Sequence, residues 1–137
     1  MKRTATAVWN GTGKDGKGHL TTQSKKLEAT NYSFVSRFED GDGTNPEELI
    51  AAAHAGCFAM KLSFNLQEKG YTADTLEAQG IVTLSDGKVT SSEIILNAKV
   101  EGIEDVEFSS LVKDAEENCP ISVLLDTDIS VKHTLNA

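Results

Sequence analysis

The stretch Asn45-Pro-Glu-Glu-Leu-Ile-Ala-Ala-Ala-His-Ala-Gly-Cys57-Phe58 predicts a long buried helix that carries a cysteine. Its first residue is a good N-cap, Pro46 suits the first helical position, and the two glutamates that follow complement the helix dipole. From Leu49 to Met60 nearly every residue is apolar or small, which is typical of a helix buried on every side. We expect the helix to end at Gly70.

The segments on either side of this helix predict antiparallel sheet and a second long helix. Alternating apolar residues predict strands, and the dipeptide Asp86-Gly87 predicts a hairpin turn. Pro120 should end the second helix and start a short one. The order of elements predicts an α+β domain in which helices cover antiparallel sheet. The expected elements are strands over 4–9, 19–24, 32–38, 76–84, 94–100 and 129–135, and a second helix over 105–118.

Length and composition predict a single globular domain over residues 1–137. Hydrophobic residues make up 39% of the chain and charged residues 25%, so disorder is not expected. The formal net charge of -8 argues against nucleic acid and anionic membranes as partners, because both attract clustered Lys and Arg.

The N-terminal residues show no secretory signal, because no apolar run follows the charges at Lys2 and Arg3. The longest weakly polar run, Leu49 to Met60, is far shorter than a membrane span of ~20 residues. We therefore expect a cytoplasmic location. A stable structural disulfide is unusual in that compartment, so the two cysteines favour catalytic, metal-binding or inert roles.

Cys57 admits two interpretations. Among alanines it is most often a small core residue, and burial in apolar surroundings raises the pKa of a thiol and makes it inert. Reactivity requires a nearby cation, and Arg37 is the candidate because it lies in an otherwise apolar predicted strand. Such an arginine needs a carboxylate, which Glu47 or Glu48 could supply. The alternative is that Glu48 closes a capping box on Asn45 while Glu47 complements the helix dipole.

Cys119 also has two interpretations. It precedes Pro120, so it could be an N-cap, where the helix dipole lowers the pKa of a thiol. Alternatively, it extends the buried stripe that ends at Ala115. The residues alone favour a two-thiol redox pair over structural bracing.

Two further patterns resemble binding sites. His54 lies one helical turn before Cys57, so both could contact one metal ion, but a closed zinc site needs four ligands and no matching pair exists elsewhere. A buried, hydrogen-bonded histidine is the preferred interpretation. The stretch from Gly11 to Gly18 nearly matches a phosphate-binding loop, but its last position lacks a hydroxyl and a strand follows, which favours a hairpin turn.

Three stretches closely resemble the OsmC/Ohr family of thiol peroxidases. They are Arg37-Phe-Glu39, the segment Gly43–Phe58 (the stretch quoted above together with Gly43 and Thr44 before it), and Asn118-Cys-Pro-Ile-Ser122. The resemblance covers the whole chain and is closer to the OsmC branch, because the Ohr branch usually has Gly-Tyr in place of Ala-His54. It implies an OsmC-like α+β fold with antiparallel sheets and two long helices. It also implies an intertwined homodimer in which the central cysteine helices are buried and the active sites lie at the subunit interface.

The resemblance also assigns roles to four residues. It implies that Cys57 is the peroxidatic cysteine, Cys119 the resolving cysteine, Arg37 the catalytic arginine and Glu47 its carboxylate, which leaves Glu48 for capping. The activity implied is reduction of organic hydroperoxides, and more weakly hydrogen peroxide, to alcohols. A sulfenic acid at Cys57 and a Cys57–Cys119 disulfide would be the intermediates.

The resemblance implies no bound cofactor or metal. An external dithiol, such as a lipoylated protein or a small thiol, would recycle the disulfide, and the biological role would be defence against oxidative and osmotic stress. Two other functions on the same fold stay open at this point. One is a redox sensor, and the other is a non-catalytic ligand-binding protein.

Overall fold

The structure is a computed structural model that describes all 137 residues, and it divides into two compact units, Met1–Leu49 and Ile50–Ala137. A single domain over 1–137 stays a prediction. The first unit holds an antiparallel sheet in the order β1-β2-β3, followed by the short helix α1. Its elements are β1 Ala5–Asn10, β2 Lys17–Thr22, β3 Thr30–Tyr32 and α1 Phe34–Phe38.

The glycine-rich stretch at 11–18 joins β1 to β2 as a hairpin connection and runs into the second strand. The phosphate-binding interpretation therefore lacks the helix N-terminus that it would need.

The predicted third strand over 32–38 is wrong beyond Tyr32, because the chain turns into α1 at Ser33. A capping box starts this helix: the Ser36 backbone N–H donates to the Ser33 hydroxyl at 3.1 Å, and the Ser33 backbone N–H donates to the Ser36 hydroxyl at 2.7 Å. The rings of Phe34 and Phe38 then meet one turn apart, with centroids separated by 4.9 Å. Arg37 consequently lies on a helix and not on a strand.

Helix α2 (Pro46–Glu68) begins as the sequence predicts and supplies the second unit from Ile50 onward. The side-chain oxygen of Asn45 accepts from the Glu48 backbone N–H at 2.8 Å, as expected of an N-cap. The Glu48 carboxylate, however, accepts from the Thr44 hydroxyl at 2.7 Å and does not close a box on the cap residue.

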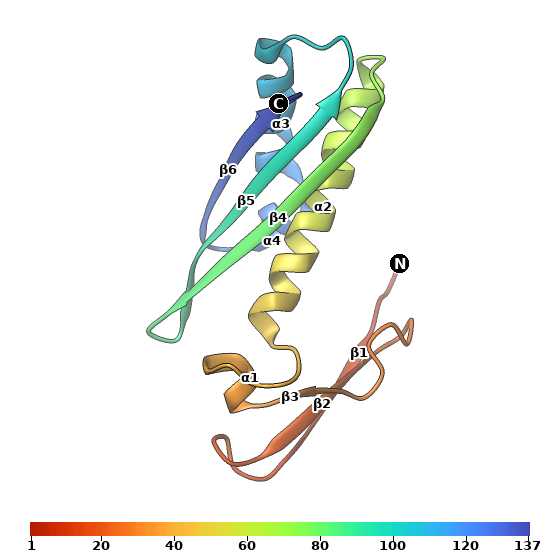
Figure 1. Cartoon of the computed structure of the whole chain (residues 1–137). Helices are drawn as coiled ribbons and strands as arrows, with labels where there is room; N and C mark the ends of the chain where they lie inside the picture. Colours follow the sequence, from red (N-terminus) through yellow and green to blue (C-terminus); the bar gives the residue numbers. More distant parts are fainter. The chain divides into compact units, whose positions relative to one another are not determined.

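The second unit is a sheet with helices on one face (Figure 1). Its order is β4-β5-β6, and Asp86 and Gly87 make the tight turn between β4 and β5 with φ of 52° and 76°. The remaining elements are β4 Ala73–Ser85, β5 Lys88–Val100, α3 Asp105–Asn118, α4 Pro120–Leu124 and β6 Asp128–Leu135.

The sheet of the second unit is mixed, whereas the sequence predicted an antiparallel one. Strand β6 pairs with β5 in parallel, from Ser91 opposite Asp128 to Ala98 opposite Leu135. The connection explains the parallel pairing. Along the chain, α3 and α4 come between β5 and β6, and they return the chain to the end of the sheet where β5 begins, as in a crossover.

The core of the second unit lies between the sheet and the two long helices. Alternate residues of β5 point into it, and α3 contributes the predicted stripe. The buried apolar residues are Phe58, Leu62, Leu66, Ile94, Leu96, Ala98, Val100, Ile103, Phe108, Leu111, Val112, Ala115 and Cys119.

Helix α2 is buried on one side only within the single chain. His54, Phe58, Leu62, Asn65 and Leu66 are buried, whereas the side chains of Met60 and Phe64 are 65% and 56% exposed. Burial on every side, as the composition predicted, therefore does not occur inside one chain. By length and composition this helix could cross a membrane, but the core helix of a soluble protein meets the same criteria.

Candidate functional site

The two cysteines lie next to each other in the second unit, although 62 positions separate them in the sequence. Cys57 is half-buried on α2, Cys119 is fully buried between α3 and α4, and both thiols are free. Burial raises the pKa of Cys57, the Ile121 backbone N–H lowers it, and the hydrogen-bonded thiol of Cys119 raises it. Cys57 packs against the buried core cluster that contains Cys119.

Both interpretations of Cys119 describe it correctly. It is the N-cap of α4, with its sulfur accepting from the Ser122 backbone N–H at 3.4 Å, and it is also part of the hydrophobic core. The Ser122 hydroxyl lies 3.1 Å from the same sulfur. The resolving thiol implied by the resemblance thus sits at the break that Pro120 causes between α3 and α4.

His54 is the buried, hydrogen-bonded histidine that the sequence favoured. Its side chain is fully buried, its Nδ1 lies 2.5 Å from the Ser92 hydroxyl, and its Nε2 lies 2.8 Å from the Ser122 hydroxyl. Burial lowers the pKa of His54, so the ring is neutral near pH 7. Both ring nitrogens are occupied by hydroxyl groups and neither faces the Cys57 sulfur.

Arg37 and Glu47 form an ion pair in the first unit. The guanidinium donates from Nη2 to one carboxylate oxygen at 2.7 Å and from Nε to both oxygens at 3.1 and 3.2 Å. Hydrogen bonds from Arg37 hold the pKa of Glu47 below its ordinary value despite partial burial. Of the two carboxylates that the sequence offered, Glu47 is therefore the partner of the arginine.

A hollow of about 400 Å³ opens beside Cys57. Its lining is almost entirely apolar, and Lys61 is the one charged residue in it. That ammonium group already lies 3.7 Å from the Asp114 carboxylate. The lining residues are Gly56, Cys57, Met60, Lys61, Phe64 and Pro120.

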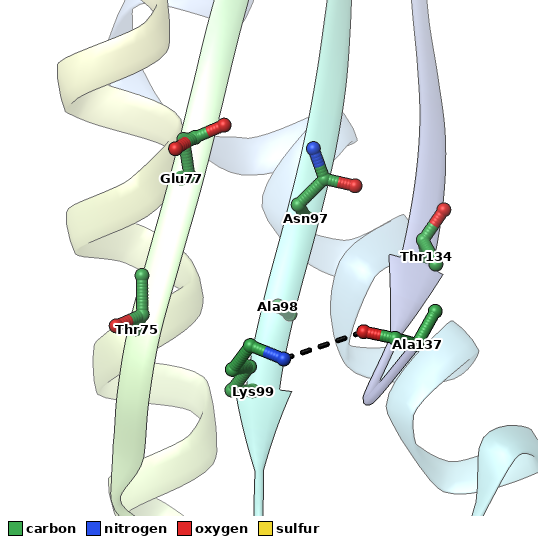
Figure 2. A pocket seen from close by; sticks show the side chains of 7 residues that line it. All are labelled: Thr75, Glu77, Asn97, Ala98, Lys99, Thr134 and Ala137. Carbon is green, nitrogen blue, oxygen red and sulfur yellow. Dashed lines mark hydrogen bonds between the residues drawn. The ribbon is translucent and has the colours of Figure 1, made fainter.

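A second hollow lies on the face of the sheet that the helices leave open (Figure 2). Figure 2 shows Glu77, Asn97 and Thr134 projecting from three neighbouring strands, with Lys99 donating to the C-terminal residue Ala137 at 3.3 Å. This hollow contains no thiol or imidazole. Cys57 and Cys119 belong to the core cluster on the opposite side of the sheet.

Comparison with known proteins decides the family. A family profile described as OsmC-like protein matches residues 39–134. The chain belongs to the OsmC-like family. This OsmC-like chain is 38% identical to peroxiredoxin OsmC of Escherichia coli over 96% of its own length and 94% of that protein. It is 30% identical to the organic hydroperoxide resistance protein OhrB of Bacillus subtilis, over 84% and 86% of the two chains.

The fold of the OsmC-like chain is shared with solved structures. It superimposes on the crystal structure of OhrB of Bacillus subtilis with a TM-score of 0.67 and 28% identity, covering 97% of this chain and 98% of the other. The predicted OsmC/Ohr family and α+β fold are therefore confirmed, and the higher identity to an OsmC protein agrees with the predicted branch.

Sequence reasoning missed the serines of this OsmC-like site. Ser122 carried a readable signal, because a residue three positions after an N-cap donates its backbone N–H to that cap. Ser92 carried none, since it reaches His54 across 38 positions of sequence through the packing of β5 against α2.

Proposed function

We propose that this chain is a thiol-dependent peroxidase that reduces organic hydroperoxides to alcohols and acts in peroxide defence. The packing of Cys57 against the core cluster that contains Cys119, beside an apolar hollow, is the observation that carries this proposal. Relatives named as a peroxiredoxin and as an organic hydroperoxide resistance protein support it. A ligand-binding role needs neither thiol, and a disulfide-forming sensor does not need the apolar hollow beside Cys57.

The proposed cycle begins with the Cys57 thiolate. It attacks the outer oxygen of the peroxide O–O bond, which releases the alcohol and leaves a sulfenic acid on Cys57. The Cys119 sulfur then attacks the Cys57 sulfur, water leaves, and a disulfide forms. An external dithiol, a lipoylated protein or a small thiol, reduces this disulfide by exchange, and no bound cofactor is needed.

The first step needs a cation, because burial and Cys119 both oppose ionisation of Cys57. We assign this role to Arg37 in the assembled protein, with Glu47 holding the planar guanidinium in place through its three hydrogen bonds. Lys61 is a less suitable cation, because Asp114 already pairs with it.

The lining beside Cys57 sets the proposed substrate class. Met60, Phe64 and Pro120 offer apolar surface to the alkyl or aryl part of a hydroperoxide, and burying that surface gives binding energy that hydrogen peroxide cannot gain. Organic hydroperoxides are therefore the better substrates.

The active form is proposed to be a cytoplasmic homodimer. Met60 and Phe64 on α2 and Val123 and Leu124 on α4 are large apolar side chains that are more than half exposed in the single chain. Apolar surface of this kind on a long central helix is typical of an interface between subunits. A second copy covering α2 would complete the burial that its composition predicts.

Turnover with cumene hydroperoxide and a dithiol tests the function. Wild type should consume peroxide continuously, the Cys57→Ser variant should not react, and the Cys119→Ser variant should react once and keep a sulfenic acid that a dimedone probe captures. A sensor would form the disulfide without sustained turnover, and a ligand-binding protein would need neither thiol. Reaction of Cys57→Ser together with inactivity of Cys119→Ser would reverse the assignment of the two cysteines.

The role of Arg37 is tested against Lys61 as a matched control. Loss of a charge-assisted contact to a buried anion costs about 1.5–3 kcal/mol, so Arg37→Met should slow oxidation of Cys57 more than tenfold. Lys61→Met removes the charged residue that lines the hollow beside Cys57 and should leave the rate nearly unchanged, because Asp114 already pairs with this lysine. Equal rates in wild type and Arg37→Met would refute the proposed role.

A further inference from the structure

A continuous chain of hydrogen-bonding groups connects the buried histidine to the resolving thiol. It runs from the Ser92 hydroxyl to Nδ1 of His54, from Nε2 to the Ser122 hydroxyl, and from that hydroxyl to the Cys119 sulfur, with steps of 2.5, 2.8 and 3.1 Å. Three elements supply it, α2, α4 and β5, and all of its members are buried. A buried polar chain of this length is kept only where every member has a partner.

We propose that Ser122 is a further catalytic residue of the resolving step, acting as the proton acceptor of the Cys119 thiol, and that His54 is the positioning residue that orients the hydroxyl and receives its proton. This inference rests on the proposed function, since it concerns the second step of that cycle. The chain of contacts starts at the sulfur of Cys119 and does not include Cys57.

The proton and electron balance of the step is complete. The Cys119 sulfur attacks the Cys57 sulfur, so an S–S bond forms while the S–O bond of the sulfenic acid breaks. The thiol proton moves to Oγ of Ser122, and the hydroxyl proton of Ser122 moves to Nε2 of His54. The departing hydroxide takes a proton from solvent and becomes water, and the protonated His54 later releases a proton to solvent. The net result is that one thiol and one sulfenic acid yield one disulfide and one water.

The surroundings of His54 suit this task. The relay requires the tautomer in which Nδ1–H donates to the Ser92 hydroxyl and Nε2 is unprotonated and faces Ser122, and the Ser92 hydroxyl can accept that hydrogen bond. The titratable group in contact with Ser122 is the thiol of Cys119. Burial alone shifts the titration of the histidine, and no charged side chain contributes. The imidazole is therefore neutral and able to accept when Cys119 reacts.

The backbone of Ser122 also contacts the same sulfur. Its backbone N–H lies 3.4 Å from the Cys119 sulfur and can stabilise the negative charge that grows there as the proton leaves. One residue thus removes the proton and stabilises the resulting thiolate.

The test follows the attack of Cys119 without any peroxide. Cys57 is first converted to a mixed disulfide with 5,5′-dithiobis(2-nitrobenzoate), and attack by Cys119 then releases a second equivalent of the coloured thiolate. The Cys119→Ser variant should release only the first equivalent. Because no peroxide is used, failure of the relay and failure of the peroxidase proposal give separate results.

The pH profile of that second release distinguishes a proton relay from a structural role. Without a base, only the preformed thiolate reacts, so the rate in Ser122→Ala should rise about tenfold per pH unit below the pKa of an ordinary thiol. Wild type should depend less steeply on pH and exceed the variant about 10²-fold at pH 6, the lower range for general base catalysis.

Two conservative variants complete the design. Ser122→Thr keeps the hydroxyl and should recover most of the wild-type rate, while His54→Gln keeps a hydrogen-bonding group but accepts no proton and should follow the steep profile of Ser122→Ala. Wild type and Ser122→Ala with the same slope would overturn the proposal. So would a Ser122→Thr variant as slow as Ser122→Ala with unchanged circular dichroism.

Discussion

Replacing Gly80 by alanine should destabilise the second unit, because the backbone of the cysteine helix lies close against this glycine. A Cβ atom at Gly80 of β4 would lie 2.5 Å from the carbonyl oxygen of Ala51 and 3.2 Å from its Cα, both in the backbone of α2. Backbone atoms cannot rotate away as a flexible side chain can. The helix or the strand would have to move by about 1 Å to restore an ordinary contact.

The expected magnitude follows from the cost of overpacking a well-packed interior. Forcing one methyl group into such a contact costs about 1–3 kcal/mol, so a central value of about 2 kcal/mol should lower the urea midpoint by about 1 M. The displaced turn of α2 lies directly before His54, so the hydrogen bond to Ser92 should weaken as well.

Urea unfolding followed by circular dichroism at one protein concentration measures the effect. The matched control is Gly13→Ala, where the same methyl group meets no atom within 4 Å and φ is not in the left-handed region. Its midpoint should stay close to that of wild type. An unchanged midpoint in Gly80→Ala, or an equal loss in Gly13→Ala, would refute the claim that the close approach of β4 and α2 limits this site to glycine.

Three further variants test the hairpin turn, the ion pair of Arg37 and the proposed dimer. Gly87→Ala should lower the free energy of unfolding by about 1 kcal/mol. The added methyl group would meet no other atom within 4 Å, but φ is +76°, so the strain is in the backbone; an unchanged urea midpoint would contradict this. Glu47→Gln should be less stable than wild type at neutral pH, because it loses the ion pair with Arg37. The folded pKa of Glu47 lies below 4.5, so the stability difference between wild type and variant should be full above pH 4.5 and should shrink as the pH falls through the folded pKa. A stability difference that is the same at all pH values would count against the ion pair. Phe64→Glu should leave the core of the second unit intact but reduce association, and light scattering that shows a folded wild-type monomer near 14.7 kDa at micromolar concentration would exclude the dimer.

The two long helices were the most predictable part of this chain, because their signals are local. The N-cap at Asn45 and the apolar stripe of α3 can be recognised from residues that are close in the sequence, and α3 runs over 105–118 as expected. The segment after Tyr32 was mistaken for a strand, since its aromatic residues favour sheet while the capping box of Ser33 favours helix. The parallel pairing of β6 could not be read locally, because it depends on the path of the crossover.

In the candidate site, too, contacts between residues close in the sequence could be predicted, and contacts between distant residues could not. The partner of Arg37 could be narrowed to two neighbouring glutamates, because an arginine among apolar residues requires a carboxylate, and the structure selects Glu47. The partners of His54 lie 38 and 68 positions away, and no spacing rule connects residues so distant. The sequence therefore predicted that the histidine is bonded but not to which groups.

The electrostatics of the two thiols impose an order on the proposed cycle. The Cys119 thiol opposes ionisation of Cys57 through its hydrogen bond and its charge, so two adjacent thiolates do not coexist in this buried position. Oxidation of Cys57 to a sulfenic acid replaces an anion by a neutral group and removes that repulsion. The Cys57 sulfur becomes electrophilic at the same moment, so attack by Cys119 follows oxidation and does not precede it. The Cys119 thiol that opposes ionisation of Cys57 before the reaction is thus the group that attacks Cys57 after it.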